Sequence, residues 1–145
     1  MRLNVIGAAI VAAAGAAVIG GAPATATGSQ DPAAAVRQEI LAGGRDSGAV
    51  ATLDGGWNRC PAGYFCIFDG YDGSGRMAYF RTGSPNLGQQ GMDKKASSQT
   101  NRSRWTFAMY EGCNYTGRVG YHPAGSQYNL SPWGGDNFDS SLRRV

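Results

Sequence analysis

A unit of fifteen residues occurs twice in this chain, forty-two positions apart. Residues 65–79 align with residues 107–121, and five of the fifteen positions are identical. The identical pairs are Phe65/Phe107, Gly70/Gly112, Gly75/Gly117, Arg76/Arg118 and Tyr79/Tyr121. With a shift of one residue, residues 93–98 also align with residues 136–141. A duplicated supersecondary unit explains both alignments, so we expect two similar halves, at about 60–101 and 102–145.

Each half has the pattern of short β-strands. Phe65 and Ile67 in the first half, like Phe107 and Met109 in the second, alternate with neighbours that can face the other side of a sheet. A glycine-containing hairpin follows, and the 23 glycines of the chain suit such turns because glycine adopts positive φ readily. A second strand, a long return (residues 82–92 or 123–135) and a closing strand come next. This order is that of a Greek key, so the sequence predicts an all-β sandwich of two keys.

The N-terminal residues have the features of a targeting segment. A single Arg2 precedes an apolar run over residues 5–20, and Ala24-Thr25-Ala26 is a candidate cleavage site. This pattern predicts a secretory signal peptide at residues 1–26 and a secreted, extracellular protein. An uncleaved membrane anchor is the alternative, which the short, alanine-rich run disfavours.

Residues 27–56 form a separate middle segment ahead of a domain expected at 57–145. It contains one helix candidate at residues 32–41, with Asp31 as N-cap, Pro32 in the first turn and Gly43-Gly44 as the stop. Its apolar stripe is thin. The segment can be a linker, a removable pro-segment, or an arm packed on the domain, and we favour a flexible or partly helical linker.

Export permits disulfide bonds, and the chain has three cysteines. Cys60 and Cys66 enclose five residues, a loop that a disulfide can close when the two Cα atoms lie within about 7 Å. We therefore predict a Cys60–Cys66 bridge, which leaves Cys113 as a buried free thiol or as a site of intermolecular pairing. The spacing fits no zinc site, and His122 is the sole histidine.

Charge and catalytic residues exclude several function classes. From Trp57 onward there are ten basic and six acidic residues, a balance without the dense basic stripe of a nucleic-acid-binding protein. A nucleophile–histidine device would depend on His122 alone, and Asp69 and Asp72 have the spacing of a turn rather than of a glycosidase pair. We expect no enzymatic activity.

Two motifs resemble known families. The pattern Tyr110, Tyr115, Gly117 resembles the aromatic corner of βγ-crystallin Greek keys, although the first half has Gly73 at the position of Tyr115, with Tyr71 as a candidate for the ring. The opening Cys60-Pro-Ala-Gly-Tyr-Phe-Cys66 resembles the peptidase inhibitor I36 family of secreted actinobacterial metalloproteinase inhibitors. This resemblance implies an inhibitor whose partner is a secreted, thermolysin-like metalloproteinase. We expect a monomer with no stable membrane association.

An inhibitor of this kind would act sterically, by presenting a rigid loop to the active-site cleft. The candidate loops are the long returns at residues 82–92 and 123–135. The second contains Tyr128, Leu130 and Trp133, which can serve as apolar anchors in a peptidase pocket. Alternatively, these three side chains fill the core or cover the edge of a sheet.

Residues 136–141 match the calcium signature of microbial βγ-crystallins, in which each ion is clamped between the two keys with a carbonyl from a hairpin corner. The candidate ligands are Asp136, Asn137, Ser140, Glu111, Asp69, Asp93 and Ser97, oxygen donors of the type that Ca²⁺ prefers. The first copy has Lys94 at the second signature position, which repels a cation, so the resemblance implies one calcium site. Alternatively, the signature serines tie down the hairpins without metal.

A calcium-binding structural or surface module without inhibitory activity is therefore the alternative function. An antimicrobial or toxin role ranks third, because the sequence has no dense basic or membrane-active face.

Overall fold

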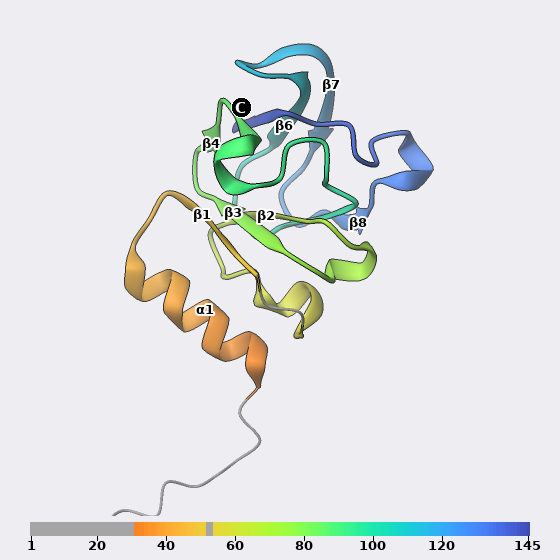
Figure 1. Cartoon of the computed structure of the whole chain (residues 1–145). Helices are drawn as coiled ribbons and strands as arrows, with labels where there is room; N and C mark the ends of the chain where they lie inside the picture. The colour runs from red at the N-terminus through yellow and green to blue at the C-terminus, as the bar shows by residue number, and fades with distance from the viewer. Residues whose placement is uncertain (1–30, 52–53) are drawn as a thin grey trace, which may run out of the picture.

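The computed structural model describes residues 31–51 and 54–145, so the predicted signal peptide lies outside the described residues. Within those ranges, no helix has both the length and the apolar character needed to cross a membrane. In the described part of the chain, one helix precedes nine strands (Figure 1): α1 Pro32–Gly43, β1 Ser47–Val50, β2 Phe65–Phe68, β3 Met77–Phe80, β4 Gly83–Ser84, β5 Ser98–Asn101, β6 Phe107–Gly112, β7 Thr116–His122, β8 Gln127–Asn129 and β9 Ser141–Arg144. Short 3₁₀ turns lie at η1 Gly56–Arg59, η2 Tyr71–Gly73, η3 Leu87–Gln90 and η4 Ser131–Trp133.

The strands form two antiparallel sheets. Their orders are β1-β3-β2-β5-β8 and β4-β9-β6-β7. The first half of the repeat supplies β2 to β5 and the second supplies β6 to β9, yet β4 belongs to the sheet of the second half and β8 to that of the first. The two halves thus exchange their third strands. This confirms the predicted sandwich of two Greek keys and explains why neither half closes its sheet alone.

The core lies between the sheets. Phe65 and Phe107, which occupy the same position in the two halves, stack with ring centroids 4.6 Å apart and planes at 9°. Burial of a side chain of this size stabilises a fold by roughly 1.5–3 kcal/mol. The other members of this buried cluster are Ile67, Ala78, Phe80, Leu87, Met92, Ala96, Met109, Leu130 and Leu142.

A serine ties each hairpin back over its sheet. The Ser98 hydroxyl donates to the Gly70 carbonyl (2.6 Å) and accepts from the Gly73 N–H (3.1 Å). Ser141 does the same in the second half, with Gly112 and Tyr115 at 2.6 and 3.0 Å. The last serine of each signature therefore holds its hairpin through two backbone groups.

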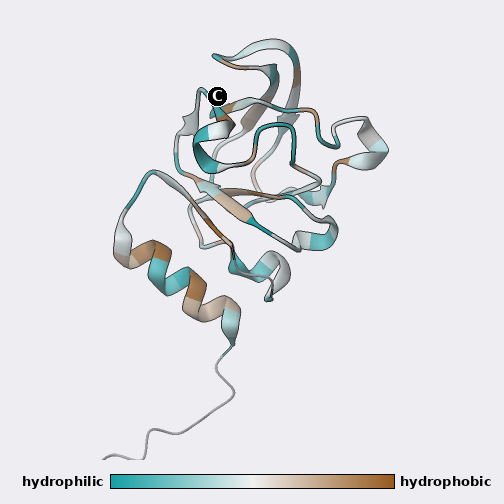
Figure 2. Cartoon of the chain, viewed as in Figure 1, coloured by the Kyte–Doolittle hydropathy of each residue, from teal (hydrophilic) through white to brown (hydrophobic). Residues whose placement is uncertain are grey.

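Residues 31–51 form a packed arm where the sequence favoured a linker. The helix begins at Asp31, whose Oδ1 accepts from the Ala33 N–H (3.0 Å), and ends at Gly44 with φ 59°. Apolar and polar residues alternate along α1 (Figure 2). Its buried residues Val36 and Ile40 pack on the face of the first sheet that points away from the second sheet (Figure 1).

Strand β1 then extends that sheet by pairing with β3, with Ser47 opposite Phe80 and Val50 opposite Met77. The apolar stripe of α1 is thin, but the surface it meets is wide, because the disulfide and several large side chains lie under it. These are Cys60, Tyr64, Cys66, Phe68, Met77 and Tyr79. An apolar face of this size has to be covered, and the arm covers it.

The 3₁₀ turn η1, which follows the arm in the chain, supplies the aromatic ring that the first hairpin lacks. A Cβ on Gly73 would lie 2.5 Å from the backbone nitrogen of Trp57, so the chain around Trp57 occupies the space of a side chain at position 73. The Trp57 ring meets Phe68 edge to face at 5.6 Å, as Tyr115 meets Tyr110 in the second half at 5.8 Å.

Tyr71, the residue that the sequence offered for this role, does not fill it. Its side chain is 47% exposed, and its hydroxyl donates instead to Asp136 Oδ2 (3.0 Å).

Candidate inhibitory segment and cation site

The segment of residues 123–135 is exposed yet fixed at several points. It starts where β7 ends, and its first turn is bonded to β5: the Gly125 N–H donates to the Asn101 carbonyl (2.9 Å), and the Asn101 N–H donates to the Ser126 carbonyl (2.8 Å). Strand β8 then pairs with β5. Near its end, the Arg118 guanidinium donates to the Gly134 carbonyl (3.0 Å). The exposed residues Pro123, Ala124, Gly125, Ser131, Pro132 and Gly134 are therefore presented by a rigid frame.

The three predicted contact residues of this segment have different surroundings. Leu130 is only 2% exposed and belongs to the core, so it anchors the segment and is not available for contact with a peptidase. Tyr128 packs against the same core, and its hydroxyl shares a 2.8 Å hydrogen bond with His122 Nδ1. Trp133 ends η4, but its side chain lies outside the described part of the structure. Core filling, the alternative interpretation, holds for Leu130.

The other candidate segment, residues 82–92, is held more closely. It contains β4 and η3, and Leu87 and Met92 are fully buried. The Leu87 N–H donates to the Ser140 carbonyl (2.8 Å), and the Asn86 side chain caps η3 by accepting from the Gly88 N–H (2.8 Å). Its exposed residues are Thr82, Pro85, Asn86, Gly88 and Gln89.

A cleft of about 560 Å³ opens beside segment 123–135. Residues 118–122 of β7 form one wall, and Tyr128, Leu130, Gly135, Phe138 and Asp139 complete its lining. His122 lies in this wall and is 6% exposed, and burial lowers its pKa to about 4. The imidazole is therefore neutral at physiological pH. Among the described strands, β7 pairs with β6 alone, so the edge of a strand borders the cleft.

The candidate calcium ligands divide into two groups related by the repeat. We name the first the Lys94 half-site, formed by Lys94 with Glu111 and Phe138. We name the second the Asn137 half-site, after the residue that the repeat aligns with Lys94; the backbone carbonyls of Asp69 and Lys95 are the counterparts there of the two that Lys94 contacts. Among residues 31–51 and 54–145, no group of three or more His, Cys, Asp or Glu side chains is arranged to hold a metal ion, so a calcium ion would depend on carbonyl oxygens as well.

The residues of the Lys94 half-site do not fit calcium. The Lys94 ammonium donates to the backbone carbonyls of Glu111 (2.5 Å) and Phe138 (2.7 Å). A divalent cation that used these oxygens would have to displace a positive charge.

The Asn137 half-site is more suitable for a cation. Neighbouring Asp136 uses Oδ2 to accept from Tyr71, whereas its Oδ1 is buried and has no hydrogen-bond partner among the described residues. An unpaired buried carboxylate oxygen is costly and fits a cation ligand. Asp69, by contrast, uses Oδ1 to accept from the Arg76 N–H (2.8 Å) within its own hairpin.

The remaining predicted ligands lie in the signature segments. Asp93 is exposed. Ser97 and Ser140 are buried, and their N–H groups donate to the Phe68 and Tyr110 carbonyls at 2.8 and 2.9 Å. The structure thus places both serines beside the corners of their own hairpins.

Asp139, which the sequence did not single out, is the most perturbed acid near these sites. It is 4% exposed, and burial raises its pKa to about 7, although Lys94 and Arg118 act in the opposite direction. The Arg118 guanidinium lies 4.2 Å from the centre of the Phe138 ring.

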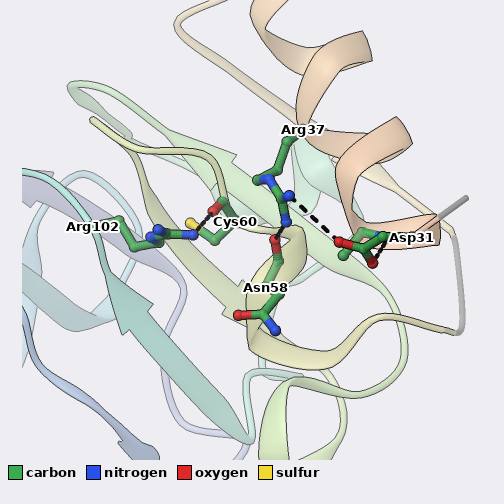
Figure 3. Close-up of polar contacts among 6 residues, drawn as sticks. Asp31, Arg37, Asn58, Cys60 and Arg102 are labelled. Carbon is green, nitrogen blue, oxygen red and sulfur yellow. Dashed lines mark hydrogen bonds and ion pairs between the residues drawn. The ribbon is translucent and has the colours of Figure 1, made fainter.

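The predicted disulfide is present. Cys60 and Cys66 are bonded, with their Cα atoms 5.9 Å apart, and the Arg102 guanidinium donates to the Cys60 carbonyl (2.8 Å; Figure 3). On the other side of this loop, Arg37 of α1 donates to the Asn58 carbonyl and pairs with Asp31 (3.6 Å; Figure 3). The bridge thus lies between the arm and the first sheet.

Cys113 is a free, exposed thiol in the second hairpin. Of the two states that the sequence left open for it, the buried one does not occur.

Comparison with known proteins gives a family and a fold. Residues 54–122 match the family model of peptidase inhibitor family I36. No curated protein matches the chain. Among solved structures, one from a study of the evolution of the eye-lens βγ-crystallin domain fold is 14% identical, with a TM-score of 0.57, and the match covers 67% of this chain and 96% of that one.

Two further structures have the same fold. A βγ-crystallin from Ciona intestinalis is 21% identical with a TM-score of 0.52, over 57% of this chain and 100% of its own. A βγ-crystallin from an archaeon is 24% identical with a TM-score of 0.51, over 58% of this chain and 99% of its own. Identities this low show the fold alone. Together with the family match, they show that the chain carries a peptidase inhibitor I36 family domain with a βγ-crystallin-like fold, a domain of inhibitors and not of enzymes.

Proposed function

We propose that this protein is a secreted inhibitor that blocks the active-site cleft of an extracellular, thermolysin-like metalloproteinase with its segment 123–135. The supporting observation is that this segment has exposed residues near both of its ends while being bonded to β5, to the core through Leu130 and to Arg118. A segment that is ordered before binding loses little conformational entropy in the complex.

The mechanism is steric. The segment occupies the cleft of the peptidase, and the neighbouring edge of β7 is available for main-chain hydrogen bonds with the partner. The Cys60–Cys66 bridge agrees with export, because such bonds persist in oxidising surroundings.

Titration of a thermolysin-type metalloproteinase with the purified protein, starting at residue 27, tests the proposal. We expect loss of peptidase activity at near-stoichiometric inhibitor and no effect on a serine peptidase. Full peptidase activity at micromolar excess of the protein would contradict it.

A pair of proline substitutions tests which segment makes the contact. Pro132 and Pro85 are both exposed and lie in segments 123–135 and 82–92. We expect Pro132→Glu to weaken inhibition at least tenfold, because it places a charge in the contact, and Pro85→Glu to leave the inhibition constant unchanged. The reverse result would assign the contact to segment 82–92.

The second candidate function is a calcium-stabilised surface module, favoured by the unpaired Asp136 Oδ1 beside Asn137. If the Asn137 half-site binds Ca²⁺ in the native state only, millimolar Ca²⁺ raises the melting temperature of the protein and a chelator reverses the rise. A melting temperature that Ca²⁺ does not change removes this candidate. The two functions are compatible, since an ion at this place would stiffen the chain next to segment 123–135.

A further inference from the structure

Lys94 and Asn137 have the same backbone conformation in the two halves. Their φ values are 53° and 55°, in the left-handed region that non-glycine residues seldom adopt. The Lys94 N–H donates to the Asp139 carbonyl and the Asn137 N–H to the Ala96 carbonyl, both at 2.9 Å. Each half thus reaches across to the other at this point with the same geometry, and the two places differ in the side chain.

The Lys94 side chain makes the contact that its counterpart lacks. Its ammonium lies 2.5 Å from the Glu111 carbonyl oxygen and 2.7 Å from that of Phe138, and 5.5 Å from the centre of the Phe138 ring. Glu111 is at the corner of the second hairpin, and Phe138 precedes β9. One charge from the first half therefore holds two elements of the second half through charge-assisted hydrogen bonds.

We infer that the Lys94 ammonium is the resident cation of its half-site and joins the two Greek keys there in place of a metal ion. Two carbonyl oxygens that converge on one positive charge have the arrangement of a cation site. An ammonium on a flexible stem fills it with directional donors, whereas Ca²⁺ needs six to eight oxygens and a place free of positive charge.

The neighbouring Lys95 shows that Lys94 is more than a solvated surface lysine. Both side chains are exposed and follow one another in the sequence. The Lys95 side chain has no hydrogen bond among the described residues, although its N–H donates to the Met92 carbonyl (3.2 Å). Lys95 is therefore a control with the same charge and nearly the same position.

Three variants of the whole mature protein test the inference: Lys94→Met, Lys94→Asn and Lys95→Met. In chelator, we expect the melting temperature of Lys94→Met to lie roughly 4 °C below that of the wild type. We expect Lys95→Met to have the melting temperature of the wild type. Lys94→Asn restores the residue type of the other half. We expect it to lose the same stability in chelator, to recover several degrees in millimolar Ca²⁺, and to bind one more Ca²⁺ per molecule than the wild type in a calorimetric titration.

Either of two results overturns the inference. One is that Lys94→Met and Lys95→Met have the same melting temperature in chelator, and the other is that Lys94→Asn binds no more Ca²⁺ than the wild type. An ion bound at the Asn137 half-site does not affect this comparison, because that half-site is the same in Lys94→Asn and in the wild type and its ion is counted in both. The outcome does not depend on peptidase inhibition, so the proposed function and this inference can fail separately.

Discussion

Asp139 is a carboxyl group that the fold buries beside two cations. Its pKa is raised from the ordinary value to about 7 because burial outweighs the attraction of Lys94 and Arg118. The native state then holds a proton at this residue that the unfolded chain releases above about pH 4. As a consequence, the contribution of Asp139 to stability is present at acid pH and is lost as the pH rises from about 4 to about 7.

We predict that Asp139→Asn flattens this dependence. The variant keeps the shape of the side chain without its charge, so its melting temperature relative to the wild type should rise between pH 4.5 and pH 7.5. Thermal melts over this range measure the difference. Asp93→Asn removes an exposed carboxylate from the first signature and controls for net charge. A constant difference between Asp139→Asn and wild type would contradict the prediction.

The contribution of His122 to stability depends on pH in the opposite direction to that of Asp139. Burial lowers its pKa from 6.5 to about 4, so the unfolded chain binds a proton there first and stability falls as the pH drops from about 6.5 to about 4. This effect is the same in the wild type and in the Asp139 variant, and the difference between their melts cancels it.

At the scale of elements, α1 packs on the first sheet through a few buried side chains. Ile40 is 3% exposed and packs on the first sheet, whereas the next residue, Leu41, is 49% exposed. Both are large aliphatic residues in the last turn of the helix.

We predict that Ile40→Ala lowers the free energy of unfolding by about 2–4 kcal/mol, because it removes buried methyl groups and leaves a cavity. Leu41→Ala should change it by no more than about 0.5 kcal/mol. Urea denaturation of both variants measures this contrast. Equal effects, or none for Ile40→Ala, would mean that the arm detaches from the sheet in solution.

The elements also show how far local sequence patterns reach. The repeat, the strand period and the hairpin glycines predicted both Greek keys, because each pattern concerns neighbours along the chain. The Cys60–Cys66 bridge was predictable for the same reason. The arm was not, since the thin stripe of Val36 and Ile40 does not reveal which surface they cover.

Candidate site residues depended on tertiary contacts in the same way. Leu130 has an apolar side chain that could contact a peptidase, but the structure places it in the core. Lys94 was recognisable in the sequence as the loss of a calcium ligand. Its ammonium contacts two carbonyls of the other half, on residues 17 and 44 positions away. The signature alone could not predict contacts with residues so distant in the sequence.

On the scale of the whole molecule, the exposed thiol of Cys113 is a group that can join two copies of the chain covalently. It is unpaired and lies at the hairpin of the second half, far in sequence from the buried Cys60–Cys66 bridge. In oxidising surroundings an exposed thiol forms intermolecular disulfides.

We predict that the purified protein forms a covalent dimer on mild oxidation and that Cys113→Ser abolishes it. Non-reducing electrophoresis and size-exclusion chromatography, with and without reductant, measure both. A dimer that persists in the Cys113→Ser variant would mean that the Cys60–Cys66 bridge exchanges between molecules.

The single difference between Gly73 and Tyr115 has a consequence for assembly. The two sheets of a duplicated fold offer related outer surfaces, so an arm that leaves its own sheet could settle on the second sheet of another molecule and start an open chain of swapped copies. Trp57 fits against Phe68 because position 73 has no side chain. In the second half Tyr115 already fills that place against Tyr110. Trp57, which follows the arm, therefore fits only against the first half of the fold, and Tyr115 in the second half works against an exchange of arms between molecules.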